Sequence, residues 1–265
     1  MRGDGLLPEP CVPDVTDLLV ALVAGLGAGA MNAVVGAGTL ITFPVLIALG
    51  LPPLVANVTS AVGIAPGNLF GAAAYRDVLL RPDVRRTAVT STAALIVGAL
   101  IGVPLLLVLP PEAFTAIVPW LILSAGVLTL VQPWLTRRMR GTSAHSGEPR
   151  LVIVFVGVLL AGVYLSYFGA ATGVITLTVL LYAGLSEIQA ANAIKNLAGG
   201  IANVVAAVLF LVFAPVDIPL AIAVALGAAV GGLLGGRLAQ RLSPAVFRWV
   251  IVAVAAIAAG YVLLT

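Results

Sequence analysis

The chain of 265 residues alternates between long apolar runs and short polar interruptions. A helix of about 20 apolar residues spans the ~30 Å hydrocarbon core of a bilayer, so the runs predict an all-α polytopic membrane protein. Helices are expected because each backbone amide in lipid needs an internal partner, and the sequence lacks the alternating strands of ~10 residues that build a membrane barrel. The predicted segments are 17–36, 39–50, 53–75, 87–109, 113–132, 151–168, 172–183, 187–213, 217–238 and 244–264.

Two of these segments, 39–50 and 172–183, are too short to cross a membrane. A helix of twelve residues is only ~18 Å long. We therefore predict that each is a short broken or re-entrant helix.

Arginines cluster in three of the intervening loops, which the positive-inside rule places in the cytoplasm. The other loops carry acids without cations, Glu112 and Asp217, and the N-terminal tail is acidic. Both termini of this multi-pass protein of the plasma (inner) membrane are then expected to be extracellular. The arginine clusters are Arg76, Arg81, Arg85 and Arg86; Arg137, Arg138, Arg140 and Arg150; and Arg237, Arg241 and Arg248.

The two halves of the chain resemble each other. Each has a glycine-rich turn, at Gly36 or Gly169, then a short apolar helix, Gly-Leu, and two asparagines eleven residues apart. The matching segments end on opposite sides of the membrane, so we predict inverted-topology repeats, which many secondary transporters share. The matched asparagines are Asn57 with Asn192 and Asn68 with Asn203. The predicted divisions are an extracellular tail (1–16), a first membrane repeat (17–133), a cytoplasmic basic linker (134–150) and a second membrane repeat (151–265).

Two stretches carry a resemblance to a known family. "PVLIALGLPPLVANVTSAVG", followed by Tyr75–Arg76, and "LLYAGLSEIQAANAIKNLAGGIAN" in the second half resemble the sulfite exporter TauE/SafE family. The resemblance covers most of residues 17–264. It implies a transporter of sulfur-containing anions such as sulfite, sulfoacetate and related organosulfonates.

The glycine-rich turns before the two short helices are the predicted substrate site. A helix that begins at membrane depth presents unpaired amides and a partial positive charge, and glycine lets an anion approach the backbone. The alternative is that the glycines only allow close helix packing. The candidate residues in the turns are Gly36, Gly38, Thr39, Gly169, Thr172 and Gly173.

Polar side chains within the apolar segments are the next candidates, because they are costly in lipid. Asn57 and Asn192 rank first, since they match across the repeat and lie closest to the short helices; the alternative for asparagines is interhelical hydrogen bonding. Thr39, Thr172 and Thr176 can donate hydroxyl hydrogen bonds, although threonines in helices often bond their own backbone. The lower-ranked asparagines are Asn68, Asn196 and Asn203.

Lys195 is the single lysine of the chain and lies inside an apolar segment. A buried ammonium needs an anion or it loses its proton, and no carboxylate is expected at its depth. A substrate anion is one partner for it; the alternative is that the side chain snorkels to the cytoplasmic interface. Its counterpart in the first repeat is Ser60, so its role is not shared by the two halves.

Composition excludes several classes of function. Hydrophobic residues make up 62% of the chain and charged residues 9%, against about 25% charged in soluble domains. The net charge of +3 does not indicate nucleic-acid binding, because membrane orientation explains the arginines. One cysteine, Cys11, and one histidine, His145, form no metal cluster or redox pair, so no cofactor and no enzyme activity are expected.

The sequence thus predicts a secondary transporter that exports sulfite or organosulfonates across the membrane by alternating access. Its partners are a small anionic substrate and the lipid bilayer, and a homo-oligomer stays open. The alternatives are an uptake permease for another small solute and a non-transport membrane subunit. A run of glycines four apart, Gly227, Gly231 and Gly235, predicts tight helix packing.

Overall fold

The computed structural model describes residues 13–142 and 149–239, and in these residues every regular element is a helix. Nine of the predicted apolar segments are confirmed as helices, with ends that differ by up to ten residues. The tenth, 244–264, lies outside the described residues, as do Cys11, His145 and most of the N-terminal tail. The helices are α1 (Val15–Val34), α2 (Thr39–Ala48), α3 (Pro53–Ala73), α4 (Arg76–Leu79), α5 (Pro82–Val108), α6 (Pro111–Thr142), α7 (Leu151–Tyr167), α8 (Thr172–Tyr182), α9 (Ile188–Phe213) and α10 (Ile218–Ala239).

Six of the described helices are long and apolar enough to cross a membrane: α1, α3, α5, α6, α9 and α10. The helices α2 and α8 have 10 and 11 residues, which confirms the two short segments. Helix α6 continues to Thr142, into the predicted linker. The single turn of α4 was not predicted, because its four residues are too few to show an apolar period.

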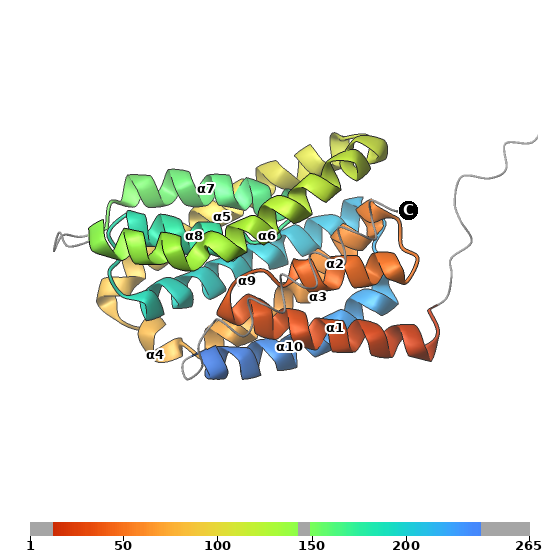
Figure 1. Ribbon diagram of the computed structural model, residues 1–265, viewed down its shortest axis with the longest axis horizontal. Coiled ribbons are helices and arrows are strands. Elements are labelled where there is room, and N and C mark those ends of the chain that lie inside the picture. Colours follow the sequence, from red (N-terminus) through yellow and green to blue (C-terminus); the bar gives the residue numbers. More distant parts are fainter. Residues whose placement is uncertain (1–12, 143–148, 240–265) are drawn as a thin grey trace, which may run out of the picture.

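The helices form two bundles, and each bundle mixes the two halves of the sequence. Helix α10 packs against α1 and α3, while α5 packs against α7 and α9. We call α1, α2, α3 and α10 the first bundle, and α5, α7, α8 and α9 the second bundle; they meet along α3 and α9 (Figure 1). Each has an apolar core, around Phe43 and Val224 in the first bundle and around Leu95 and Leu180 in the second.

The main contacts are unchanged when α1, α2, α3 and α5 are exchanged with α7, α8, α9 and α10. The turns agree as well. Gly36 and Gly169 have φ of +86° and +78°, and each donates its amide to the carbonyl five residues earlier, on Met31 and Tyr164. This left-handed turn ends α1 and α7 in the same way. The arrangement is compatible with the predicted repeat, and its inverted relation stays a prediction.

Glycines allow α1 and α10 to touch, as the four-residue spacing predicted. A Cβ on Gly227 or Gly231 would overlap the carbonyl oxygen of Leu22 or Leu26 on α1. In return, a Cβ on Gly29 of α1 would overlap the carbonyl oxygen of Ala228. The two helices run side by side along one edge of the molecule (Figure 1).

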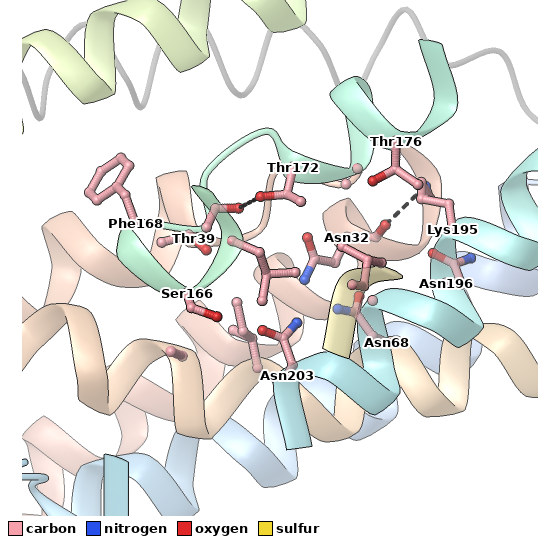
Figure 2. A pocket seen from close by; sticks show the side chains of 18 of the residues that line it. Asn32, Thr39, Asn68, Ser166, Phe168, Thr172, Thr176, Lys195, Asn196 and Asn203 are labelled. Carbon is pink, nitrogen blue, oxygen red and sulfur yellow. Dashed lines mark hydrogen bonds between the residues drawn. The ribbon is translucent and has the colours of Figure 1, made fainter. Parts of the chain in front are cut away.

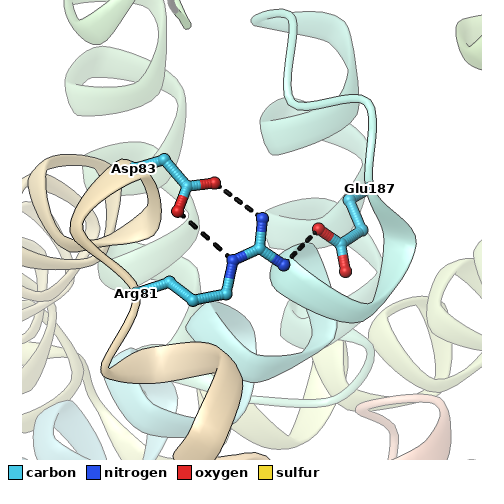
Figure 3. A network of polar contacts seen from close by, with 3 residues as sticks. All are labelled: Arg81, Asp83 and Glu187. Atoms are coloured by element: carbon cyan, nitrogen blue, oxygen red, sulfur yellow. Dashed lines mark hydrogen bonds and ion pairs between the residues drawn. The ribbon is translucent and has the colours of Figure 1, made fainter.

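An ion-pair network joins the start of α5 to the start of α9 within the second bundle (Figure 3). The Arg81 guanidinium donates to Glu187 at 2.7 Å and to both carboxylate oxygens of Asp83, at 2.7 and 3.2 Å. The bonds to Asp83 and then to Glu187 raise the pKa of Arg81. Since Arg81 belongs to a predicted cytoplasmic loop, the pair assigns the start of α9 to the same predicted side.

We expect Gly29→Ala to lower the thermal stability of the protein, because the added methyl group must push α10 away from α1. Overpacking of this kind costs about 1–3 kcal/mol. Gly27→Ala on the same helix is the matched control, since its Cβ would lie 3.7 Å from Ile41 and a helical alanine gains up to about 1 kcal/mol over glycine. Thermal unfolding in detergent checks both; equal melting temperatures would contradict the packing argument.

Candidate functional site

A small cavity lies between the two bundles, at the level where α1 and α7 end. Its volume is about 30 Å³, which holds about two waters if one water needs about 10–15 Å³. Polar side chains from both bundles line it (Figure 2). The lining residues are Asn32, Gly36, Thr39, Asn57, Ala61, Ile64, Asn68, Leu95, Leu165, Ser166, Phe168, Gly169, Thr172, Gly173, Thr176, Lys195, Asn196, Gly199 and Asn203.

The two glycine-rich turns meet beside this cavity. The amide of Gly173 donates to the carbonyl oxygen of Gly36 at 3.2 Å. A Cβ on either glycine would overlap the other residue's Cα. The contact agrees with the packing interpretation of these glycines, and their part in a substrate site stays a prediction, since both also border the cavity.

The first residues of the short helices, Thr39 and Thr172, both line the cavity (Figure 2). The Thr172 hydroxyl donates to the carbonyl oxygen of Gly169 at 3.0 Å, as threonines in membrane helices often do. The Thr39 hydroxyl has no hydrogen-bond partner among the described residues. Of the two, Thr39 is the donor that is available to a ligand.

Some of the backbone amides that were predicted to bind an anion already donate hydrogen bonds within the protein. Gly38 donates its amide to the Asn32 side-chain oxygen at 2.8 Å, and Gly173 donates to Gly36. A ligand at the helix starts would therefore depend more on side chains than the sequence predicted.

Lys195 points into the protein and is 4% exposed. Its ammonium donates to the main-chain oxygens of Asn32 and Ala33, at 3.3 and 3.4 Å. These carbonyls belong to the last turn of α1, where the helix dipole places partial negative charge. In this conformation Lys195 caps a helix end at the cavity and does not snorkel to the membrane surface.

Asparagines from each bundle also donate hydrogen bonds to the helix end of the other bundle. Asn196 donates its amide to the Ala33 oxygen at 3.2 Å. Asn57 on α3 donates to the oxygen of Tyr167, the last residue of α7, at 3.1 Å. Each broken helix thus has terminal carbonyls satisfied by side chains of the other bundle, because open carbonyls at membrane depth would be costly.

Two polar atoms at the cavity lack partners among the described residues. Ser166 is 2% exposed and Asn196 is 1% exposed, and the Ser166 hydroxyl and the Asn196 side-chain oxygen form no hydrogen bond. Buried polar atoms usually have a partner, so unpaired ones point to a bound ligand or water.

Most of the predicted site residues come together at this cavity. Gly38 and Asn192 do not line it, since Gly38 packs against Ala28 of α1 and Asn192 lies a turn from the lining residue Lys195. Figure 2 shows Asn32, Asn68 and Asn203 gathered near the start of α8. The predicted residues that line it are Gly36, Thr39, Asn57, Gly169, Thr172, Gly173 and Lys195.

Sequence reasoning missed Asn32 and Ser166. Asn32 precedes the glycine of its turn by four residues, and Ser166 precedes its own glycine by three. A polar side chain in the last turn before a membrane-depth break was the available signal. The repeat comparison began at the glycines and so passed over both residues.

Comparison with known proteins identifies the family of the chain. The family profile described as sulfite exporter TauE/SafE matches residues 21–262. The chain belongs to this family. Members are membrane transporters, and this chain is accordingly a multi-pass membrane protein of a transporter family.

Two relatives of the TauE/SafE chain agree with this class. It is 27% identical over 162 residues to "Probable membrane transporter protein ORF9" of Sinorhizobium sp, a match that covers 59% of this chain and 58% of the relative. It is 29% identical over 198 residues to a "Probable membrane transporter protein" of Haemophilus influenzae, covering 71% of this chain and 72% of the relative. Both names give a transporter and no substrate.

We expect Asn57→Leu to destabilise the TauE/SafE chain, because the Tyr167 carbonyl would lose its donor. A buried acceptor left without a partner costs about 1–3 kcal/mol. Asn192→Leu is the matched control, since Asn192 is the repeat counterpart of Asn57 but its side-chain oxygen has no bond to lose. Melting temperatures in detergent compare the two; a larger loss for Asn192→Leu would contradict the capping role of Asn57.

Proposed function

We propose that the protein is a secondary transporter of small oxyanions that exports sulfite or organosulfonates such as sulfoacetate across the plasma membrane. The observation that carries the proposal is the buried Lys195 ammonium at the cavity. Among the described lining residues it meets carbonyls and neutral side chains but no carboxylate. An oxyanion supplies the charge that this site lacks.

Neutral donors around the cavity fit the oxygens of such a ligand. The hydroxyls of Thr39 and Ser166 have no acceptor among the described residues, and the amide groups of Asn68 and Asn203 reach the same space. Hydrogen bonds from neutral donors to an anion stabilise it without a second fixed cation. This supports an anion of low charge.

Alternating access is the mechanism that we propose for transport. The cavity has room for about two waters, whereas a sulfur oxyanion has four or more heavy atoms, so we propose that the site widens to take its substrate. Polar contacts between the bundles gather at one level, at Gly36, Lys195, Asn196 and Asn57. The bundles can therefore part on either side of this level while the contacts hold as a pivot.

The direction that we propose is export. The interior-negative membrane potential favours the exit of an anion, by about 2.3 kcal/mol per charge at 100 mV. The described residues place no carboxylate at the cavity that would oppose a leaving anion.

We expect sulfite or sulfoacetate to raise the melting temperature of the purified protein, with sulfate and chloride as comparison anions. Lys195→Ala should weaken binding about thirtyfold, or about 2 kcal/mol, because a desolvated charge pair is lost, while Lys195→Arg should keep part of it. Asn192→Ala, one turn away and outside the cavity lining, is the control. Unchanged affinity in Lys195→Ala would remove the anion site, and no stabilisation of the wild-type protein would remove the anion class.

We also propose that the arginine-rich loops are cytoplasmic and both termini extracellular. In intact cells a membrane-impermeant maleimide should then label Cys11, the one native cysteine. In a Cys11→Ala background it should label Glu112→Cys and spare Asp77→Cys, whose position is exposed but on the opposite side. Labelling of Asp77→Cys from outside would reverse the orientation.

A further inference from the structure

Lys195 is the one titratable side chain among the described residues that line the cavity. The helices packed around it bring no charge to its level. Helix α3 has no charged residue, and Tyr164 and Tyr167 on α7 pack against the apolar core of the first bundle. The other charged or titratable groups on these helices lie at helix ends and outside the cavity lining: Asp17 on α1, Asp83, Arg85 and Arg86 on α5, Tyr182 on α8, and Glu187 before α9.

The contacts of the ammonium leave part of its charge uncompensated. Its two carbonyl partners lie at 3.3 and 3.4 Å, which is long for a bond donated by an ammonium. The nearest described carboxylate along α9, Glu187, is already bound to Arg81 and is about 12 Å away along the helix axis. The protonated amine and a bound anion therefore stabilise each other, and this coupling is reciprocal.

The cavity also offers a hydrogen-bond acceptor to a protonated ligand. The side-chain oxygen of Asn196 is buried without a partner, next in sequence to Lys195. A fully deprotonated oxyanion cannot donate to it, whereas a protonated oxyanion or a water can. The site thus has a place for the ligand in both protonation states.

We propose that Lys195 carries a proton in each transport cycle, so that the exported anion leaves together with a proton. The inference rests on the proposed anion transport and adds its coupling. A permanent counter-charge is the competing role for Lys195, and it predicts transport without proton movement through the protein.

The step balances with sulfite as the substrate. The dianion binds beside the ammonium, one N–H bond breaks with its electron pair left on nitrogen, and the proton forms a bond to the anion, giving hydrogensulfite and a neutral amine. Hydrogensulfite leaves on the far side. After the cavity reopens to the cytoplasmic side, the amine takes a proton from a water molecule there, which restores the ammonium and leaves hydroxide on that side. Each cycle therefore moves one sulfite and one proton outward.

The test measures sulfite flux and internal pH together in proteoliposomes held at zero membrane potential. An alkaline buffer is used, in which free sulfite is the dianion and cannot carry the proton itself. Wild type and Asn192→Ala should move protons with sulfite, above the rate of protein-free vesicles. Lys195→Arg keeps its charge but cannot release a proton, so it should bind sulfite while its sulfite-driven pH change falls by about tenfold or more.

Lys195→Met is the second variant, in case the larger guanidinium does not fit beside Gly173, whose Cβ would lie 3.1 Å from Lys195 Cδ. We expect it to lose both flux and pH change. Wild-type sulfite flux that leaves the internal pH unchanged overturns the proton role and leaves the proposed function standing. An unchanged number of protons per sulfite in either variant also overturns it. Absence of wild-type sulfite flux overturns the proposed function and the coupling with it.

Discussion

The structure depends on the hydrogen bonds that two interrupted helices, α1 and α7, obtain for their terminal carbonyls at membrane depth. Helices α1 and α7 both stop at a left-handed glycine, and the last three carbonyls of each helix have no helical partners. Lys195 and Asn196 from α9 bond the end of α1, and Asn57 from α3 bonds the end of α7. Because each donor comes from the other bundle, the same bonds that make the breaks tolerable also hold the bundles together.

This reciprocal capping explains why the cavity lies where it does. Short helices can begin at this depth only after a turn, and the turns can approach only through Gly36 and Gly173. The space left between them is lined by the side chains that do the capping. The glycine contacts of α1 with α10 and of α5 with α7 keep each bundle compact, and the contact of Gly36 with Gly173 joins the two bundles just as closely.

Much of the fold could be predicted from hydrophobic runs, because lipid makes an apolar segment a helix almost without exception. The short lengths of 39–50 and 172–183 were informative for the same reason. Which helices pack together in each bundle was not predictable. Apolar helix surfaces in lipid do not select one partner, and small residues allow many different helix contacts. The single turn of α4 was missed because four residues are too few to show a hydrophobic period.

The residues of the candidate site could be predicted where they match between the two halves of the sequence. Two residues without a polar counterpart in the other half were missed. Gly36, Gly169, Thr39 and Thr172 stood out by symmetry, whereas Asn32 and Ser166 have no polar counterpart in the other half. Gly38 looked available to a ligand, but its amide is bound to Asn32, a tertiary contact that spacing does not reveal.

Among the described residues that line the cavity, Lys195 carries a charge that the other half of the chain does not repeat. Its counterpart Ser60 forms a hydrogen bond with Thr42 inside the first bundle and places no charge at the cavity. A lysine at both positions would set two ammonium groups around one small space, and like charges at short range in a poorly screened interior repel strongly. One lysine instead gives the cavity a single ammonium, which is the group on which the proposed anion site depends. The residues that match between the halves therefore supply the turns at the cavity, whereas Lys195, like Asn32 and Ser166, has no counterpart of its kind in the other half.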